Sequence, residues 1–112
     1  MSKRTIISMP GDGIGKVVLD EAIRVLDAAG FEAYYVEGDI GWEFWRSEGN
    51  PLPQRTLDLI AEHKIGLFGA ITSKPKDEAF NALSPELQEK GLVYASPIVG
   101  LRQHFGLDIC LR

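Results

Sequence analysis

Apolar and polar positions along the chain alternate in some stretches and recur at helical spacing in others. Residues 5–9 and 31–37 have the pattern of short strands, and between them apolar residues recur every three or four positions from Val18 to Ala29. Asp12 is a suitable N-cap for this helix, and Gly30 a suitable end. A strand, a single helix and a second strand predict a right-handed parallel βαβ unit.

The middle of the chain continues the alternation of helices and strands. A short helix is expected between Gly41 and Gly49, followed by a turn at residues 50–53 and a helix over about residues 53–63. The apolar run 65–71 is typical of a buried strand. Residues 72–81 are polar and predict a loop, and residues 84–86 open another short helix that Gly91 ends.

The last segment predicts a helix followed by a strand. Ser96 is a good N-cap, Pro97 suits the first helical position, and Gly106 stops the helix after Phe105. Residues 107–111 alternate as a strand does, which places Arg112 at the strand's far end. The whole pattern predicts one α/β unit over residues 1–112, a mostly parallel sheet with helices on both faces.

Composition narrows the possible classes of function. The chain has 12 Lys and Arg against 16 Asp and Glu, with no basic stripe that would favour nucleic acid as a partner. Its longest apolar runs have the length of strands, so we expect no membrane segment and a cytoplasmic protein. The single cysteine, Cys110, is expected to be a core thiol, and two histidines without a partner pattern do not predict a metal site.

Several polar or aromatic groups are candidates for chemistry. The glycine-rich turn at residues 10–15 could receive an anion at a helix start, or it could be only a tight turn. A dinucleotide fingerprint fails there because Lys16 stands where its third glycine would be. Arg102 and Arg112 could clamp carboxylates together with Ser96, whereas the simpler alternatives are a solvated arginine and a helix cap.

Other side chains have structural explanations. Residues 42, 44 and 45 are aromatic and are expected in the core or at an interface. Asp39, Glu43 and Glu48 are expected to form a solvated helical face, and His63 and His104 to be exposed in the last turns of helices.

Three segments in order carry a resemblance to a known family. They are residues 9–15 (MPGDGIG), residues 69–73 (GAITS) with Pro75, and residues 96–112 with their Ser, Leu-Arg-Gln and Cys-Leu-Arg elements. Together they resemble the N-terminal part of the β-decarboxylating dehydrogenases, the family of isocitrate and 3-isopropylmalate dehydrogenases. The resemblance implies an isocitrate/isopropylmalate dehydrogenase-like α/β fold, of which this chain is an incomplete part.

The resemblance also implies a reaction and a set of site residues. The reaction is oxidation of a 2-hydroxy acid by NAD or NADP with a divalent metal, followed by loss of a carboxylate. Ser96, Arg102 and Arg112 would bind the substrate, a small polycarboxylate. Thr72 would lie on the nicotinamide side of the cofactor, with Ile14 beside it. The family is typically homodimeric, and its Mg or Mn ligands and its catalytic tyrosine and lysine lie beyond these residues, so we expect the chain alone to be inactive.

Departures from the family leave the substrate open. Lys16 and Val17 replace the usual Pro-Glu after the glycines, and Ile98 stands where similar isocitrate-using members carry asparagine. Ser96 therefore favours isocitrate and Ile98 a different 3-substituted malate, and the choice between NAD and NADP stays open. The alternative functions are a non-catalytic module that binds a polycarboxylate or nucleotide or serves assembly, and an interaction domain that docks through Trp42 and Trp45.

Overall fold

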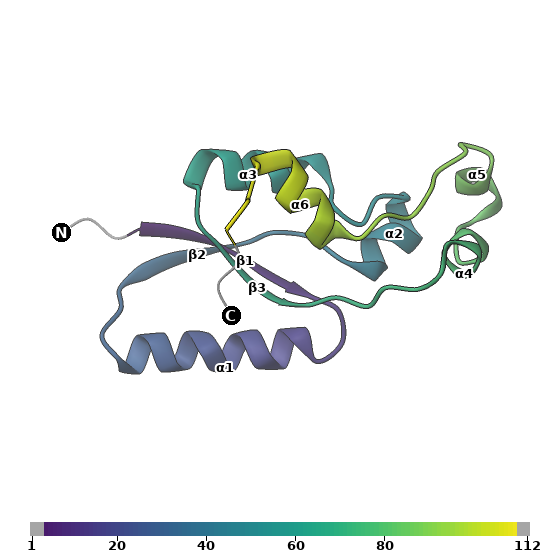
Figure 1. The fold of residues 1–112 in the computed structure, drawn as a ribbon. Coiled ribbons are helices and arrows are strands. Elements are labelled where there is room, and N and C mark those ends of the chain that lie inside the picture. The colour runs from purple at the N-terminus through teal and green to yellow at the C-terminus, as the bar shows by residue number, and fades with distance from the viewer. Residues whose placement is uncertain (1–3, 110–112) are drawn as a thin grey trace.

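A three-stranded parallel sheet forms the centre of the computed structural model, which describes residues 4–109 of the chain (Figure 1). Its strands are β1 (Arg4–Gly11), β2 (Ala33–Glu37) and β3 (Gly66–Ala70), in the order β2-β1-β3. Ile7 of β1 lies opposite Val36 of β2 and Gly66 of β3. Both pairings are parallel, so the predicted βαβ unit is confirmed.

Helices cover both faces of this sheet, as predicted. α1 (Gly15–Ala28) lies on one face, and α3 (Gln54–His63) and α6 (Pro97–Phe105) lie on the other (Figure 1). α2 (Trp42–Glu48), α4 (Lys76–Asn81) and α5 (Pro85–Gln88) lie beyond the carboxyl ends of β1 and β3. In the described part of the chain, no helix combines the length and the apolar character needed to cross a bilayer.

The buried side chains form two separate clusters. The sheet cluster contains Ile7, Met9, Ile40 and Leu101, with partly buried residues of α3 and α6 packed against it. The helical cluster contains Trp45, Ala79, Leu83 and Tyr94. Because Trp45 is only 1% exposed, it belongs to the core and is not available to a docking surface.

The sequence predicted a polar loop over residues 72–81, which holds for residues 72–75 but is wrong for residues 76–81, which form α4. Pro75 precedes the helix, and Asp77 and Glu78 in its first turn favour the positive end of the helix dipole. Ala79 is completely buried, and its carbonyl accepts a hydrogen bond of 2.8 Å from the indole N–H of Trp45. Tertiary contact at this one small residue outweighs the polar composition of the segment.

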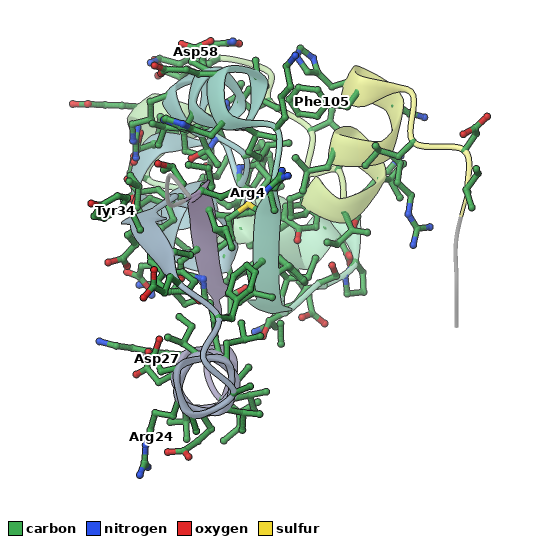
Figure 2. The ribbon with its side chains drawn as sticks, turned by 90° about the vertical axis from the view of Figure 1, so that its left-hand side faces the viewer. Arg4, Arg24, Asp27, Tyr34, Asp58 and Phe105 are labelled. Atoms are coloured by element: carbon green, nitrogen blue, oxygen red, sulfur yellow. The ribbon has the colours of Figure 1, made fainter. Side chains whose placement is uncertain are left out.

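α1 buries a narrower stripe than its apolar pattern predicted. Figure 2 views the helix end-on, with Arg24 pointing away from the sheet. Gly15 and Leu19 are buried, but Val18 and Val25 are 54% and 67% exposed. A single helix on a sheet of three strands can bury only the stripe that contacts β1 and β3, and these two valines lie outside it.

The predicted strand at residues 107–111 is not formed over its described part. α6 ends as predicted at Gly106, whose φ is 61°. Residues 107–109 belong to no strand, and Leu107 and Ile109 are 58% and 80% exposed. Alternation shows which side chains a strand would bury, but a strand also needs a partner for its backbone hydrogen bonds. Cys110 and Arg112 lie outside the described residues.

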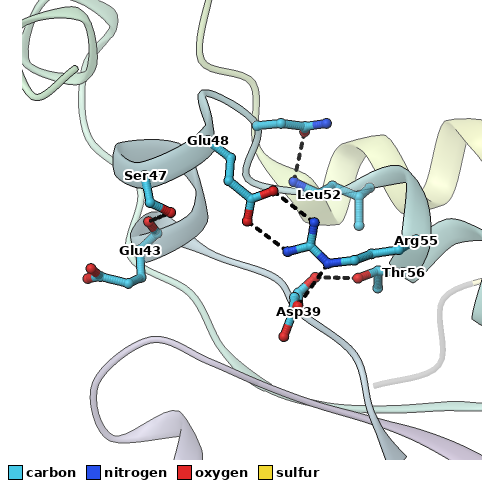
Figure 3. A network of polar contacts seen from close by, with 8 residues as sticks. Asp39, Glu43, Ser47, Glu48, Leu52, Arg55 and Thr56 are labelled. Atoms are coloured by element: carbon cyan, nitrogen blue, oxygen red, sulfur yellow. Dashed lines mark hydrogen bonds and ion pairs between the residues drawn. The ribbon is translucent and has the colours of Figure 1, made fainter. Parts of the chain in front are cut away.

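Arg55 of α3 corrects the prediction that Asp39 and Glu48 belong to a free solvated face. Its guanidinium donates to Asp39 Oδ2 at 2.9 Å and to both carboxylate oxygens of Glu48 at 2.8 and 2.7 Å (Figure 3). These hydrogen bonds lower the pKa of Glu48 and raise that of Arg55. Arg55 therefore ties the end of α2 and the segment after β2 to α3.

We expect Arg55→Gln to destabilise the chain only slightly at neutral pH, since both partners are partly exposed and screened by water. Glu48 has a lowered pKa when folded, so its stabilising effect is present above the usual Glu value of about 4.3 and is lost as pH falls through the lowered value. Urea denaturation measures the difference in free energy of unfolding between Arg55→Gln and the unsubstituted chain. This difference should be smaller at strongly acidic pH than at neutral pH. Arg24→Gln, which breaks only an exposed pair with Glu21, is the control, and an equal loss at both pH values would contradict the pairing.

Candidate functional site

The glycine-rich turn packs directly against the end of β3. A Cβ atom on Gly11, which has φ 76°, would overlap the carbonyl oxygen of Ala70. A Cβ on Gly15 would lie 2.7 Å from the amide nitrogen of Ala70, and the amide of Asp12 donates to the Ala70 carbonyl at 2.7 Å. The space that these glycines leave is filled by protein backbone. Gly11 and Gly15 therefore serve a tight turn, and neither leaves an open cradle for a phosphate.

The carboxylate of Asp12 joins three segments, and it does not cap α1 as predicted. The N-cap of α1 is Ile14, and no side-chain hydrogen bond caps the helix. Both carboxylate oxygens of Asp12 accept the amide of Trp42, at 2.8 and 2.9 Å, and one also accepts the amide of Thr72 at 2.8 Å. Gly41, with φ 119°, makes this approach possible because a Cβ there would lie 2.6 Å from Asp12 Oδ1.

Tyr94 connects Thr72 to the segment that leads into α6. Its hydroxyl donates to the carbonyl of Thr72 at 3.2 Å and lies 3.2 Å from Ser73 Oγ. The rings of Trp42 and Trp45 meet Tyr94 edge-on, with centroid distances of 5.5 and 5.3 Å. Ser96 follows two residues later. The Thr72 amide donates to Asp12, and the Tyr94 hydroxyl donates to the Thr72 carbonyl, so the first two segments that carry the resemblance are linked to each other and to the residues just before the third.

The structure places the five predicted site residues in different surroundings. Ile14 is 66% exposed at the start of α1, and Thr72 is exposed in the segment after β3. Ser96 is half-buried at the N-cap of α6, though its side chain makes no capping hydrogen bond. Arg102 is exposed on the same helix, and Arg112 lies outside the described residues. Convergence of the two arginines on one ligand therefore stays a prediction.

Ser96 opens onto a cavity that Arg102 does not share. The cavity has a volume of about 410 Å³, and its lining includes Leu52, Leu57, Gly100 and His104. Neither Thr72 nor Arg102 lines it. The described structure thus joins Thr72 to the glycine turn but does not bring Ser96 and Arg102 into one cavity.

Two residues of this arrangement were missed by the sequence reasoning. Asp12 lies between two glycines of positive φ, Gly11 at 76° and Gly13 at 52°. Such a pair can turn a side chain away from the following helix, so the Gly-Asp-Gly sequence held a usable signal. Tyr94 carried no signal, because its position is set by the rings of the helical cluster.

The acidic and histidine side chains of the described residues do not gather into a metal site. Over residues 4–109 no group of three or more His, Cys, Asp or Glu side chains could hold a metal ion. His104 is exposed as predicted, whereas His63 is half-buried, 3.8 Å from Glu62. The described residues do not fit a divalent metal centre.

A solved structure of known class shares this fold. The apo crystal structure of a β-decarboxylating dehydrogenase from Thermococcus kodakarensis matches with a TM-score of 0.64 and 31% identity, over 93% of this chain and 27% of that one. The fold is therefore an α/β unit of the β-decarboxylating dehydrogenase type. The family model for isocitrate/isopropylmalate dehydrogenase matches residues 5–112, and the chain belongs to this family.

Curated relatives agree with this family and are much longer than the chain. A homoisocitrate dehydrogenase from Methanocaldococcus jannaschii is 41% identical, and a 3-isopropylmalate dehydrogenase from Cupriavidus pinatubonensis is 36% identical. Each match covers 91% of this chain but 26% of the relative. Protein DlpA from Legionella pneumophila is 45% identical over 93% of this chain and 17% of its own length. The chain thus spans about a quarter or less of the length of these relatives.

Proposed function

We propose that the chain is the N-terminal α/β unit of an NAD(P)-linked oxidative decarboxylase of isocitrate or a related 3-substituted malate. The observation that supports this function best is the hydrogen-bonded link between Asp12, Thr72 and Tyr94. It joins the first two family-like segments and ends two residues before the third, beyond the carboxyl ends of β1 and β3, where open α/β sheets bind their ligands.

The substrate would be held by the third of these segments. Arg102 and Arg112 supply guanidinium groups, which bind carboxylates through two parallel hydrogen bonds. Ser96 would contact the variable substituent of the malate. Arg102 is exposed, so its guanidinium is accessible to a substrate.

The cofactor would meet the first two segments. Ile14 offers an exposed apolar side chain and Thr72 an exposed polar one, which suits a nicotinamide ring with its carboxamide. Bound NAD or NADP would supply the hydride acceptor. The filled space around Gly11 and Gly15 argues against pyrophosphate binding at this turn.

The remaining parts of the reaction are assigned to residues beyond this unit. The catalytic tyrosine and lysine and the ligands for Mg or Mn would come from there, so the 112 residues alone are proposed to be inactive. A homodimer in the cytoplasm, with neither nucleic acid nor membrane as a partner, completes the proposal.

Calorimetry with isocitrate and with 3-isopropylmalate tests the substrate site. We expect binding weaker than micromolar, because the other site residues lie beyond this unit, and a further loss of about tenfold in Arg102→Gln, because a charged hydrogen bond is lost. Arg24→Gln, an exposed arginine on α1, should leave binding unchanged. If Arg102→Gln binds as well as the unsubstituted chain, the assignment of Arg102 is wrong.

An activity assay of the same chain separates the proposal from its alternatives. With Mg²⁺, NAD⁺ or NADP⁺ and either substrate, no reduced cofactor should form. Measurable reduction would overturn the claim that the unit is inactive alone. Micromolar polycarboxylate binding that needs no further residues would favour the non-catalytic binding module instead.

A further inference from the structure

We infer that Asp12 and Tyr94 are positioning residues that hold Thr72 for its contact with the nicotinamide side of the cofactor. The inference rests on the proposed function, because it takes Thr72 as a cofactor contact. It adds two residues that do not touch the ligand themselves. Asp12 fixes the amide of Thr72, and Tyr94 fixes its carbonyl.

The backbone of Thr72 is held in a way that the fold alone does not require. Residues 71–75 belong to no helix or strand, so no ladder of backbone hydrogen bonds holds them. Thr72 is exposed, and water could satisfy both of its backbone groups. Instead, side chains 60 and 22 residues away in the sequence bind its amide and its carbonyl. The peptide is fixed in place while its side chain stays accessible.

Asp12 is itself held from several directions. Its amide donates to Ala70 at 2.7 Å, and its carboxylate accepts the amide of Trp42 as well as that of Thr72. The missing side chain of Gly41 leaves room for the carboxylate. An ionised acceptor makes stronger hydrogen bonds than a neutral one, so Asp12 sets the position of Thr72 relative to the turn that carries Ile14.

The direction of the Tyr94 hydroxyl is set by packing. Tyr94 is 6% exposed, and its ring lies edge-on against Trp42 and Trp45. The ring cannot turn without disturbing the helical cluster, so the hydroxyl stays directed at the Thr72 carbonyl. A polar contact to a cofactor depends on placement within about half an ångström, which such a supporting layer provides.

Tyr94→Phe tests the inference because it keeps the ring and removes only the hydroxyl. The measurement is amide NMR of the 112-residue chain titrated with NAD⁺ and with NADP⁺. In the unsubstituted chain the resonances of Ile14 and Thr72 should move with cofactor. In Tyr94→Phe the shift at Thr72 should fall at least by half and the dissociation constant rise about fivefold, while Ile14 still responds.

Tyr35→Phe is the matched control, because the buried Tyr35 hydroxyl on β2 has no hydrogen-bond partner within the described structure. It should leave the cofactor response unchanged. Asp12→Asn is a second variant and should also speed hydrogen exchange of the Thr72 amide. Unchanged amide resonances of β1 and β3 would show that the sheet is intact in each variant.

The outcomes separate the inference from the function on which it rests. If neither cofactor moves Ile14 or Thr72 in the unsubstituted chain, the proposed cofactor contact fails and the positioning role fails with it. If cofactor moves Thr72 equally in Tyr94→Phe, Asp12→Asn and the unsubstituted chain, the positioning role alone is overturned. A loss of response at Thr72 in both variants, with Tyr35→Phe unaffected, supports it.

Discussion

Replacing Gly15 with alanine should destabilise the chain by about 3 kcal/mol or more, although alanine is the better helix former. Gly15 opens α1, and the added Cβ would lie 2.7 Å from the amide nitrogen of Ala70 and would overlap the carbonyl oxygen of Pro10. Both neighbours are backbone atoms of strands in the sheet, so neither can move aside cheaply. Urea denaturation followed by circular dichroism measures the loss.

Gly100→Ala is the matched control for this steric conflict. Gly100 also lies within a helix, α6, but the nearest atom to its added Cβ is the flexible Leu52 Cδ2, at 3.3 Å. We expect stability to change by about 1 kcal/mol or less, since alanine gains helix propensity. If Gly15→Ala were as well tolerated as Gly100→Ala, the backbone contact between the glycine turn and β3 would be disproved.

Trp45→Ala should cost about 3–5 kcal/mol, the usual range for removing a fully buried aromatic side chain. Trp45 is 1% exposed, contacts the ring of Tyr94 edge-on, and donates from its indole to the Ala79 carbonyl. Its removal leaves a cavity in the helical cluster and an unpaired buried carbonyl. Thermal and urea denaturation should both show the loss.

Two further variants separate the contribution of the Trp45 ring from that of its hydrogen bond and from that of the neighbouring Trp42. Trp45→Phe keeps an aromatic ring but leaves the Ala79 carbonyl without its donor, so we expect an intermediate loss of about 1–3 kcal/mol. Trp42→Ala removes a half-buried ring and should cost less than Trp45→Ala. A small effect of Trp45→Ala would favour an exposed docking role for this residue over a core role.

Local patterns in the sequence were sufficient to predict most of the helices and strands. The βαβ unit, the helices over residues 42–48, 54–63 and 97–105, and the stop at Gly106 all follow from periodicity and from Gly and Pro signals within a few residues. These features depend on neighbours in the sequence. The fold class and the family resemblance could therefore be predicted without the structure.

The errors concern features that depend on distant partners. α4 forms because Ala79 packs on Trp45, 34 residues away, and the polar composition of the segment gives no sign of this contact. The carboxylate oxygens of Asp12 accept hydrogen bonds from amides 30 and 60 residues away in the sequence. The sequence alone shows no such distant partner, so it favoured a cap on the helix that follows directly. The exposure of Val18 and Val25 depends on the width of the sheet that α1 packs against. A local sequence pattern does not contain this information.

The two buried clusters lie in different parts of the molecule. The described chain extends 50 × 27 × 26 Å, and the sheet cluster and the helical cluster lie along its length. The peptide of Thr72 is bonded to both parts, because its amide donates to Asp12, just after β1, and its carbonyl accepts from Tyr94 of the helical cluster. A molecule bound at Thr72 would therefore contact a peptide that is held both by the turn after β1 and by the helical cluster.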